Sequence, residues 1–228
     1  MTAQKKRHPF LVFLLVILTV FSLLGVSFRV ILLPPITAYL AENTVNDTLS
    51  ALDHDQLVAV AEMGRAYVAG DRGAEMPVGD DERTAFPPDV VSHMVDVRIV
   101  IQGAFIFTLA VLFVWLVILI CTGRMAGRKS VSVGLFLGGI MAVALTLALT
   151  IFGAINFDAL FTSLHELFFA DGTWTFAEDS LLICAYPLQF WIGMAVFWAL
   201  ALVILSAVVS VVGFSLGRKA EKPSTGKD

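Results

Sequence analysis

The chain has 228 residues, of which 58% are hydrophobic and 15% are charged, and its mean hydropathy is +0.86. A soluble domain carries ~25% charged residues, so this composition excludes a soluble globular protein and predicts an integral membrane protein. The net charge of −4 is the sum of basic and acidic segments that lie apart along the chain. It gives no reason to expect a nucleic-acid partner.

Four long apolar stretches each reach the ~20 residues that a helix needs to cross a ~30 Å hydrocarbon core. We therefore expect an all-α membrane protein with four transmembrane helices and a small outward-facing cap. The expected segments are a cytoplasmic N-terminus (1–9), a first span (10–33), an outer segment (34–96), a second span (97–121), a cytoplasmic loop (122–130), a third span (131–155), an outer interfacial segment (156–187), a fourth span (188–214) and a cytoplasmic tail (215–228). The cap is built from the two outer segments. The first span is too long for the ~7–15-residue apolar region of a cleaved signal peptide.

Charge next to the spans predicts their orientation. The flanking basic residues are Lys5, Lys6, Arg7, Arg124, Arg128, Lys129, Arg218, Lys219, Lys222 and Lys227. The segment 34–96 instead has three arginines against twelve acidic residues, and 156–187 has five acidic residues and no Lys or Arg. Because basic loops stay in the cytoplasm, both termini are predicted to be cytoplasmic and both long connections to face outward. Cys121 and Cys184 then lie on opposite sides of the membrane and are not expected to pair.

Within the first outer segment, the pattern predicts one helix and one loop. Asp53 or Asp55 can cap a helix with apolar residues at helical spacing, and Gly70 can end it. The following residues, 71–89, are acidic and rich in Gly and Pro, which is typical of a mobile loop. His93 is then expected to open the helix that continues into the second span.

The second outer segment begins with an amphipathic pattern. A helical stripe is formed by Phe157, Leu160, Phe161, Leu164 and Phe168. This pattern predicts a short helix that lies in the membrane interface with its apolar face down, and His165 falls at the edge of the stripe. Asp171 and Gly172 should break the helix, and residues 173–176 alternate as a short strand does.

Two of the histidines, His93 and His165, each stand where a polar segment meets an apolar one. An imidazole has an unperturbed pKa near 6.5 and can exchange a proton near neutral pH. A single histidine in such a place is more commonly an amphipathic interface residue. Two on the same predicted side of the membrane are what acid/base chemistry on a lipid ester needs.

The polar neighbours of the two histidines have different expected roles. Asp96 follows His93 by one helical turn, so its carboxylate can orient the ring and support its charged form. Glu166 is adjacent to His165 but projects in another direction, and we interpret it as a solvated acid. Asp179 lies with Glu178 in a predicted loop, and the simpler interpretation is that both belong to a hydrated acidic surface.

Two further residues are candidates for contact with lipid. Arg29, near the outer end of the first span, can extend its guanidinium to the headgroups or bind a lipid phosphate or carbonyl. Trp174 fits an aromatic belt at the interface, as do Tyr186 and Trp191.

No motif of a soluble enzyme is present. The sequence His165-Glu166 begins like the zinc-protease motif His-Glu-x-x-His, but Phe169 occupies the position of the second ligand. A looser zinc site from His54, His93 and His165 is an alternative, although His54 lies in an exposed acidic context. We therefore expect no metal and no cofactor.

Several motifs together resemble a family of four-span bacterial membrane proteins, long described as of unknown function, which includes the lipoprotein intramolecular transacylase Lit. The motifs are His-Met-Val-Asp-Val-Arg at 93–98, His-Glu-Leu-Phe-Phe at 165–169, Gly-Thr-Trp-Thr-Phe at 172–176, Asp179, Pro187 and Phe190-Trp191, with an aromatic residue, Tyr67, near the end of the helix in the outer domain. Their order and spacing together, rather than any one of them, carry the resemblance.

The resemblance implies a membrane acyltransferase. Such an enzyme moves the sn-2 acyl chain of a diacylglyceryl-modified lipoprotein onto the amine of its N-terminal cysteine and yields a lyso-form lipoprotein. It implies that His93 and His165 are the catalytic pair. Asp96, Arg29, Trp174 and Asp179 are the candidate substrate-binding or orienting residues. The implied partners are diacylglyceryl-modified lipoproteins and membrane lipids, and the implied location is the bacterial cell membrane with the active face outward.

The residues leave some choices open. They do not say which histidine takes the amine proton and which serves the ester oxygens. An acyl-enzyme route is less favoured because neither Ser92 nor Ser163 is an obvious nucleophile. The alternatives to a transacylase are a non-catalytic membrane protein that binds a lipid or partner through its cap, and an enzyme of another lipid acyl or hydrolytic reaction.

Overall fold

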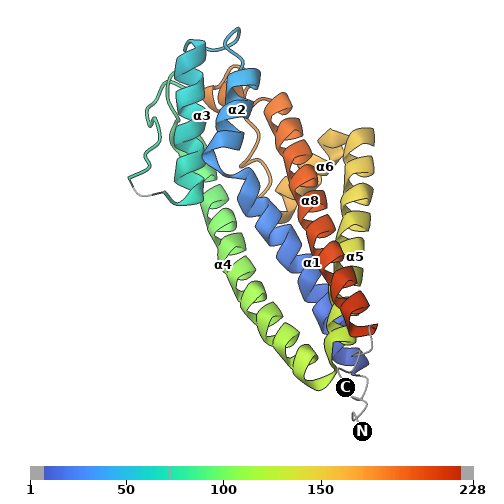
Figure 1. The fold of residues 1–228 in the computed structure, drawn as a ribbon. Helices are drawn as coiled ribbons and strands as arrows, with labels where there is room; N and C mark the ends of the chain where they lie inside the picture. The colour runs from blue at the N-terminus through green and yellow to red at the C-terminus, as the bar shows by residue number, and fades with distance from the viewer. Residues whose placement is uncertain (1–7, 72, 222–228) are drawn as a thin grey trace, which may run out of the picture. The chain divides into compact units, whose positions relative to one another are not determined.

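Eight helices make up the part of the chain that is described, residues 8–71 and 73–221 of a computed structural model. They are α1 (Pro9–Ile31), α2 (Pro34–Thr44), α3 (His54–Ala69), α4 (Pro88–Met125), α5 (Arg128–Ile155), α6 (Phe157–Phe168), α7 (Leu181–Ala185) and α8 (Leu188–Glu221), shown in Figure 1. Over these residues the only β pairing is an isolated bridge between Val78 and Phe86. The predicted all-α class is confirmed.

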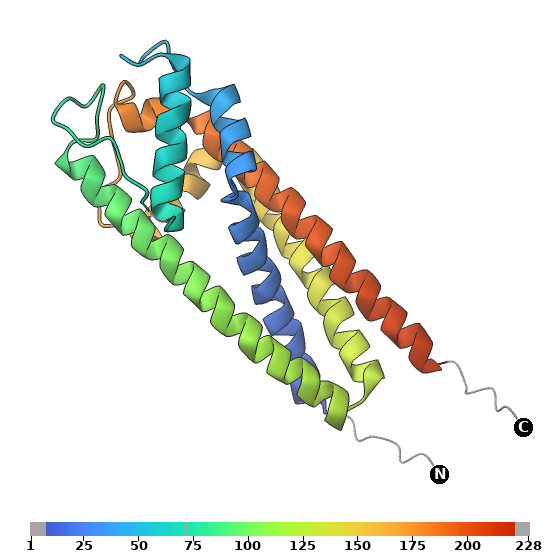
Figure 2. The ribbon, with the colours of Figure 1, turned by 60° about the vertical axis from the view of Figure 1, so that its left-hand side comes forward.

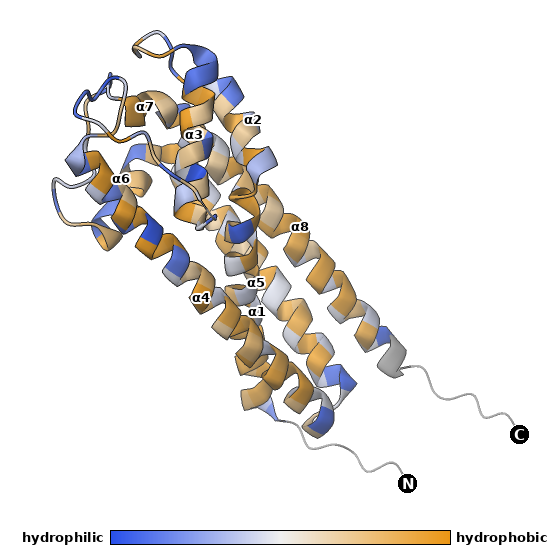
Figure 3. Ribbon diagram, turned by 90° about the vertical axis from the view of Figure 1, so that its left-hand side faces the viewer, coloured by the Kyte–Doolittle hydropathy of each residue, from blue (hydrophilic) through white to orange (hydrophobic). Residues whose placement is uncertain are grey.

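Four of the helices, α1, α4, α5 and α8, are long and apolar enough to cross a membrane, and they are mostly hydrophobic along their lengths in Figure 3. This confirms the predicted four-span membrane protein. Helix α4 has 38 residues, far more than the ~20 that a span requires, and Figure 2 shows it unbroken. Its first residues, 88–96, include polar and charged side chains, whereas the predicted span, 97–121, is mostly apolar. His93 lies before that stretch.

The chain divides into two compact units. Among the described residues, the bundle unit comprises 8–27, 106–149 and 199–221, and holds most of the apolar length of the four long helices. The cap unit comprises 28–71, 73–105 and 150–198. It contains α2, α3, α6 and α7 as well as the adjoining ends of the long helices.

Small and hydroxylated side chains pack the bundle unit. A Cβ on Gly134 would meet Leu15, and one on Gly138 would meet Thr19, so α5 approaches α1 closely at both places. Close approach over small residues is how helices associate in lipid, where no hydrophobic force favours one apolar contact over another. The indole Nε1 of Trp115 donates a 2.9 Å hydrogen bond to Oγ1 of Thr19, which ties α4 to α1.

The cap unit has its own apolar core. Its fully buried side chains include Leu57, Phe86, Leu181 and Cys184, each with 0% exposure. The hydroxyl of Tyr186 donates a 2.6 Å hydrogen bond to the carbonyl of Ala61, and burial raises the pKa of this hydroxyl above its usual value. Tyr186 therefore joins the segment before α8 to α3 through a buried polar contact.

Arg65 holds the end of α1 against α3. Its guanidinium is only 6% exposed and donates to Glu62 Oε1 at 2.8 Å, to Asp71 Oδ2 at 2.7 Å and to the Leu32 carbonyl at 3.5 Å. The hydrogen bond to Glu62 is the main cause of its raised pKa. A buried charge needs such partners because desolvating it alone is costly.

Helix α3 confirms its predicted ends. Asp53 is the N-cap of a capping box, in which its side chain accepts from the backbone N–H of Gln56 at 2.9 Å. Gly70 ends the helix with φ of 80°, a left-handed conformation that a residue without Cβ adopts at no steric cost. Both ends of the helix depend on residues close to them in the sequence, so the sequence alone is sufficient to predict them.

Other expectations for the cap unit need correction. Helix α2 was not predicted, and α4 begins at Pro88 rather than at His93. The strand expected over 173–176 is wrong, because these residues have no β pairing. The loop after α3 was expected to be mobile, yet Phe86 is fully buried and the Glu82 carbonyl accepts a 2.8 Å hydrogen bond from the backbone of Leu181.

The contact between α3 and Tyr186 gives a stability prediction. A Cβ on Gly64 would meet the Tyr186 hydroxyl, so Gly64→Ala should lower the melting temperature of the purified protein in detergent. The loss should shrink in a Tyr186→Phe background, since the atom that clashes is gone. Gly103→Ala is the matched control, because its Cβ would meet nothing within 4 Å and alanine is the better helix former. Equal losses in both backgrounds would contradict this contact.

Candidate active site

His93 lies in the second turn of α4 and is 7% exposed. Two aromatic rings enclose it, Phe169 at 5.0 Å and Phe176 at 5.5 Å between ring centroids. Its Nδ1 atom is buried and has no hydrogen-bond partner among the described residues. Native proteins rarely bury a polar atom unpaired without a functional or structural reason.

His165 lies in the last turn of α6, a helix capped at its start by the Asn156 side chain, which accepts from the backbone of Ala159 at 3.0 Å. Its Nδ1 is 2.8 Å from the Phe161 carbonyl oxygen, one helical turn back. Since a carbonyl can only accept, Nδ1 carries the proton and donates it. In the neutral ring, Nε2 therefore keeps its lone pair and can act as a base.

The two imidazole rings come together although they are far apart in the sequence. Their centroids are 6.4 Å apart and their planes differ by 22°. Direct contact of carbon atoms needs only ~3.5–4.0 Å, so the rings do not touch face to face. His93 and His165 are thus close neighbours in the structure.

An aromatic shell surrounds the pair. It consists of Phe161, Phe169, Trp174 and Phe176, each of which lies against at least one of the two histidines. Trp191 packs against Phe161 and contacts neither histidine ring. The Phe161 ring lies 4.0 Å from His165, and the Trp174 ring lies 4.9 Å from it.

The sequence had suggested Trp174. Phe161 was interpreted as part of the interfacial stripe and Phe176 as part of a short strand. Phe169 entered only as a member of a family motif and as the residue that rules out the zinc-protease motif. The sequence shows how far these phenylalanines are from the histidines along the chain. Their contact with the histidines in space depends on the turn after α6.

Burial sets the charge state of both histidines. Desolvation lowers the pKa of His93 from 6.5 to about 4; the charge of His165 lowers it further, and Asp96 opposes this. Desolvation also lowers the pKa of His165, against a raising effect of its hydrogen bond to Phe161. Two buried imidazoles this close cannot both carry a charge cheaply. Both rings are therefore neutral near pH 7.

Trp174 brings a second unpaired polar atom to this shell. Its indole Nε1 is buried and has no hydrogen-bond partner in the described part of the chain. Trp191 differs, because its Nε1 donates a 3.0 Å hydrogen bond to the Tyr186 carbonyl. An indole nitrogen can only donate, so Trp174 offers one hydrogen-bond donor beside His165.

The other predicted site residues do not join the shell. Asp96 is exposed and influences His93 through its charge, with no hydrogen bond between the two. Arg29 is exposed, and its guanidinium lies 4.2 Å from the Phe105 ring centroid. Asp179 is exposed, and its charge acts on the thiol of Cys184 rather than on either histidine. Glu166 is exposed, as the sequence had suggested.

The structure gives no support to the zinc alternative. His54 lies 3.7 Å from Glu42 and 3.9 Å from Asp47 instead of joining His93 and His165. Over residues 8–71 and 73–221, no group of three or more His, Cys, Asp or Glu side chains is placed to hold a metal ion. Cys121 and Cys184 are both free thiols.

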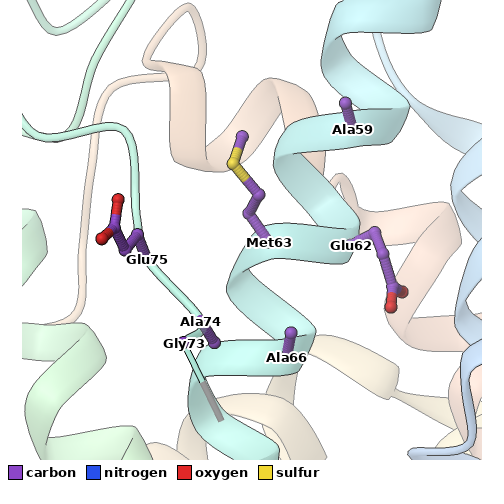
Figure 4. A pocket seen from close by; sticks show the side chains of 7 residues that line it. All are labelled: Ala59, Glu62, Met63, Ala66, Gly73, Ala74 and Glu75. Atoms are coloured by element: carbon purple, nitrogen blue, oxygen red, sulfur yellow. The ribbon is translucent and has the colours of Figure 1, made fainter. Parts of the chain in front are cut away.

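A separate hollow of about 410 Å³ lies between α3 and residues 73–75 and contains neither histidine. Figure 4 shows that Met63 and Glu62 point to different sides of α3 there. Glu62 is already paired with Arg65. We assign no chemistry to this hollow, because none of its lining side chains is an unpartnered buried polar group.

The arrangement is suited to moving one proton in a water-poor site. It offers a lone pair on His165 and hydrogen-bond capacity on His93 and Trp174. Aromatic rings make up much of the remaining surroundings, and such apolar faces keep water away from the histidines. These are the groups that transfer between an ester and a nucleophile requires: a base, a donor and a dry enclosure.

The comparison with known proteins supports a site for acyl transfer. The family model described as "Lipoprotein intramolecular transacylase Lit" matches residues 10–191. A structure of the membrane integral lipoprotein intramolecular transacylase Lit from Bacillus cereus is similar, with 18% identity, a TM-score of 0.72 and coverage of 93% of this chain and 96% of that chain. At such an identity the likeness shows the fold alone.

Two variant structures of the same Bacillus cereus protein match as well. In one a histidine is replaced by arginine and in the other by alanine, and each is 17% identical with a TM-score of 0.72. The aligned regions cover 93% of this chain and 92% and 94% of those chains. No curated protein sequence matches the chain.

The lowered pKa of His93 predicts a loss of stability in acid. The unfolded chain takes up this proton near pH 6.5, and the folded chain only near pH 4. The unfolded state thus binds more protons between these values, so stability is fully present above pH 6.5 and falls as the pH drops toward 4. Melting temperatures of wild type and His93→Gln, measured in detergent at pH 7 and pH 5, should show the larger drop in wild type.

His54→Gln is the control, since His54 is 37% exposed and pairs with surface carboxylates. It should retain the wild-type drop between pH 7 and pH 5. A His93→Gln protein that loses as much stability as wild type over this range would contradict the assignment of a buried neutral imidazole.

Proposed function

The chain belongs to the Lit family of lipoprotein intramolecular transacylases, and we propose that His93 and His165 within their aromatic shell carry out its acyl transfer. The substrate is a diacylglyceryl-modified lipoprotein. Its sn-2 acyl chain moves to the amine of the N-terminal cysteine, and the product is the lyso-form. The observation that carries this proposal is the 6.4 Å approach of two buried imidazoles with one ring fixed by a carbonyl.

The reaction needs one proton to be moved and no net proton to be supplied. The neutral amine attacks the ester carbonyl and forms a C–N bond. The bond from the carbonyl carbon to the glyceryl oxygen then breaks, and the proton lost by the amine ends on that oxygen. The conversion of an ester and an amine into an amide and an alcohol is thermodynamically favourable. One group that accepts the proton and then returns it is therefore sufficient.

His165 is the group best placed to carry that proton. Its Nδ1–H is held by the Phe161 carbonyl at 2.8 Å, which leaves Nε2 as the lone pair. A base whose other nitrogen is held in this way keeps one tautomer and one orientation. Because desolvation lowers its pKa, the imidazolium formed on accepting the amine proton readily gives it up to the glyceryl oxygen.

His93 acts on the oxygen side of the reaction. With a pKa of about 4 it is neutral at pH 7, and a neutral imidazole N–H can polarise a carbonyl or donate to a developing oxyanion. Its unpaired Nδ1 is available for such a bond. Asp96 is exposed and lies one turn further along α4. Its negative charge partly opposes the lowering of the His93 pKa, and no hydrogen bond joins the two side chains.

Trp174 supplies a second donor. Its unpaired Nε1–H can bind the ester carbonyl oxygen or the glyceryl oxygen, which would compensate for its burial. Preorganised donors at the developing charge are the largest single contribution in many acyl-transfer enzymes. The phenylalanine rings hold the acyl chain and keep water from competing with the amine.

The membrane arrangement supplies the substrate. The basic flanks of the spans predict that both termini are cytoplasmic and that the cap unit lies at the outer surface of the bacterial cell membrane, where lipid-modified cysteines are presented. Exposed apolar side chains of α6, Leu164 at 49% and Leu167 at 71%, give the lipid an apolar route to the site. Arg29 contacts headgroups at the boundary, and Asp179 has a solvated role outside the reacting groups.

Substituting either histidine tests the assignment. His93→Ala and His165→Ala should each lower the transfer rate by ~10²–10⁴-fold, the usual loss of a positioned acid or base. The readout is mass spectrometry of a synthetic diacylglyceryl lipopeptide incubated with the purified protein in detergent. His54→Ala changes the third described histidine of the cap unit without entering the shell and should keep the wild-type rate.

Full conversion by either variant would remove that histidine from the mechanism. If wild type itself leaves the lipopeptide unchanged while binding it, the cap is a binding module and the histidines are structural. Release of free fatty acid in place of amide would mean that water outcompetes the amine, so the protein would be a lipid hydrolase.

Trp174→Phe separates its hydrogen bond from its ring. The variant keeps an aromatic face beside His165 but loses the N–H, so the transfer rate should fall by ~10²-fold with little change in melting temperature. Trp191→Phe is the matched control. It loses a hydrogen bond within the fold, so its melting temperature should fall while the rate of the folded protein changes little. The opposite pattern would assign Trp174 a structural role.

A further inference from the structure

Two arginines of the cap unit lie at the predicted membrane boundary without the acidic partners that Arg65 has. Arg98 is half-buried and Arg29 is exposed. Within residues 8–71 and 73–221, neither guanidinium forms a hydrogen bond or an ion pair. We propose that they bind the headgroup of one phospholipid, whose phosphate contacts Arg98 and whose ester carbonyl contacts Arg29. This site does not depend on acyl transfer, because neither arginine belongs to the shell around the histidines.

Arg98 contacts an aromatic ring instead of a carboxylate. Its guanidinium carbon lies 4.6 Å from the centre of the Tyr67 ring, within the ~6 Å range of a cation–π contact. The ring face attracts the charge but provides no oxygen atom for the five N–H donors of the guanidinium. Those donors therefore stay available to an anion with several oxygens, and the planar group matches the geometry of a phosphate.

Contacts between α3 and α4 hold the Tyr67 ring beside Arg98. Gln102, one turn further along α4, donates a 2.8 Å hydrogen bond from Nε2 to the Val68 carbonyl. A Cβ on Gly70 would lie 2.9 Å from the same Nε2 atom, so the end of α3 approaches α4 closely. The guanidinium of Arg98 is thereby positioned by the fold before a ligand binds.

Arg29 has the same kind of contact further along α4. Its guanidinium carbon lies 4.2 Å from the centre of the Phe105 ring, and the Phe28 ring lies 6.2 Å from Phe105. Arg98, Gln102 and Phe105 follow one another at intervals of four and three residues, so they share one face of α4. Seven residues of helix correspond to ~10 Å along the axis, so the two guanidinium groups lie along this face at different depths.

Arg65 shows how the cap unit binds an arginine that is part of the fold. Its guanidinium donates to oxygen atoms, including those of Glu62 at 2.8 Å and Asp71 at 2.7 Å. Arg98 and Arg29 instead have only ring contacts among the described residues. The difference indicates that their N–H donors serve a partner from outside the chain.

The predicted spans place the two cations at the depth of a lipid headgroup. Arg98 is the second residue of the predicted span 97–121, and Arg29 comes four residues before the end of the predicted span 10–33. Arg98 is thus level with the lipid phosphates, and Arg29 lies about one helical turn deeper, at the level of the ester carbonyls. An arginine at such a depth is costly unless its charge is paired, and a lipid phosphate supplies that pairing.

The experiment uses the full-length protein in detergent with added phosphatidylglycerol, or with diacylglycerol of the same acyl chains, which lacks the phosphate. Native mass spectrometry should detect one retained phosphatidylglycerol and less diacylglycerol, and the melting temperature should rise more with phosphatidylglycerol. In Arg98→Gln, phosphatidylglycerol should bind about fivefold more weakly, because one basic residue near a membrane surface contributes ~1 kcal/mol toward anionic lipid.

Arg83→Gln is the matched control. Arg83 is an exposed arginine of the same unit, and its charge acts on Asp81 and Cys184, so its removal should leave the bound lipid unchanged. Arg29→Gln should also weaken the binding of phosphatidylglycerol. This second variant keeps the test decisive if Arg98→Gln does not fold, because Arg29 is exposed and its loss removes no hydrogen bond within the described chain.

Several results would overturn the proposal. Equal retention of phosphatidylglycerol and diacylglycerol would mean that the arginines do not recognise phosphate. An equal rise in melting temperature with sodium phosphate would assign the site to free phosphate instead of a lipid. Equal losses in Arg98→Gln and Arg83→Gln would assign the effect to general surface charge.

Conversion of the synthetic lipopeptide is measured on the same preparations, so a failure of acyl transfer is distinguishable from a failure of lipid binding. Unchanged binding of phosphatidylglycerol in Arg98→Gln or in Arg29→Gln would contradict the proposal. If Arg98→Gln kept the phospholipid but lost conversion of the lipopeptide, Arg98 would bind the substrate instead.

Discussion

The 2.8 Å hydrogen bond from His165 to the Phe161 carbonyl is the contact on which the proposed chemistry depends. It uses a carbonyl in the last turns of α6, so the helix that carries the histidine also fixes its tautomer. In the same turn, the His165 carbonyl accepts a 2.8 Å hydrogen bond from the backbone N–H of Phe169. Phe169 is thereby directed back over both imidazoles, and the end of α6 builds the base and part of its enclosure at once.

The long α4 supplies the other half of the site. Because the helix begins at Pro88 and continues without a break, His93 is held on a rigid element instead of on a loop. Burial of two imidazoles costs most when they become charged, and the lowered pKa values keep them neutral. The reaction proposed here uses them in that neutral state and charges one of them only in passing. Both the stability of the fold and the proposed chemistry therefore require the two histidines to be neutral.

Sequence reasoning reached the parts of this protein that local patterns determine. The four spans, the Asp53 cap, the Gly70 end and the amphipathic helix that carries His165 all rest on composition or spacing within a few residues. It missed α2, and it interpreted the alternation around Trp174 as a strand. Phe169 and Phe176 were missed as site residues because their contact with His93 depends on how α6 ends and how the following loop returns, which no local pattern specifies. His93 and His165 were singled out by their positions at polar–apolar boundaries on the same predicted side of the membrane, and the family resemblance added the catalytic role that it implies for them.

The central claim is that His165 is a neutral base with its proton on Nδ1 at the pH of catalysis. Nitrogen-15 NMR of histidine-labelled protein in lipid nanodiscs, with His165→Gln to assign its signals, measures this directly. The account predicts a neutral His165 in the Nδ1–H tautomer at pH 6.5, where an ordinary imidazole is about half charged. A predominantly protonated ring at that pH, or a neutral ring with its proton on Nε2, would contradict it.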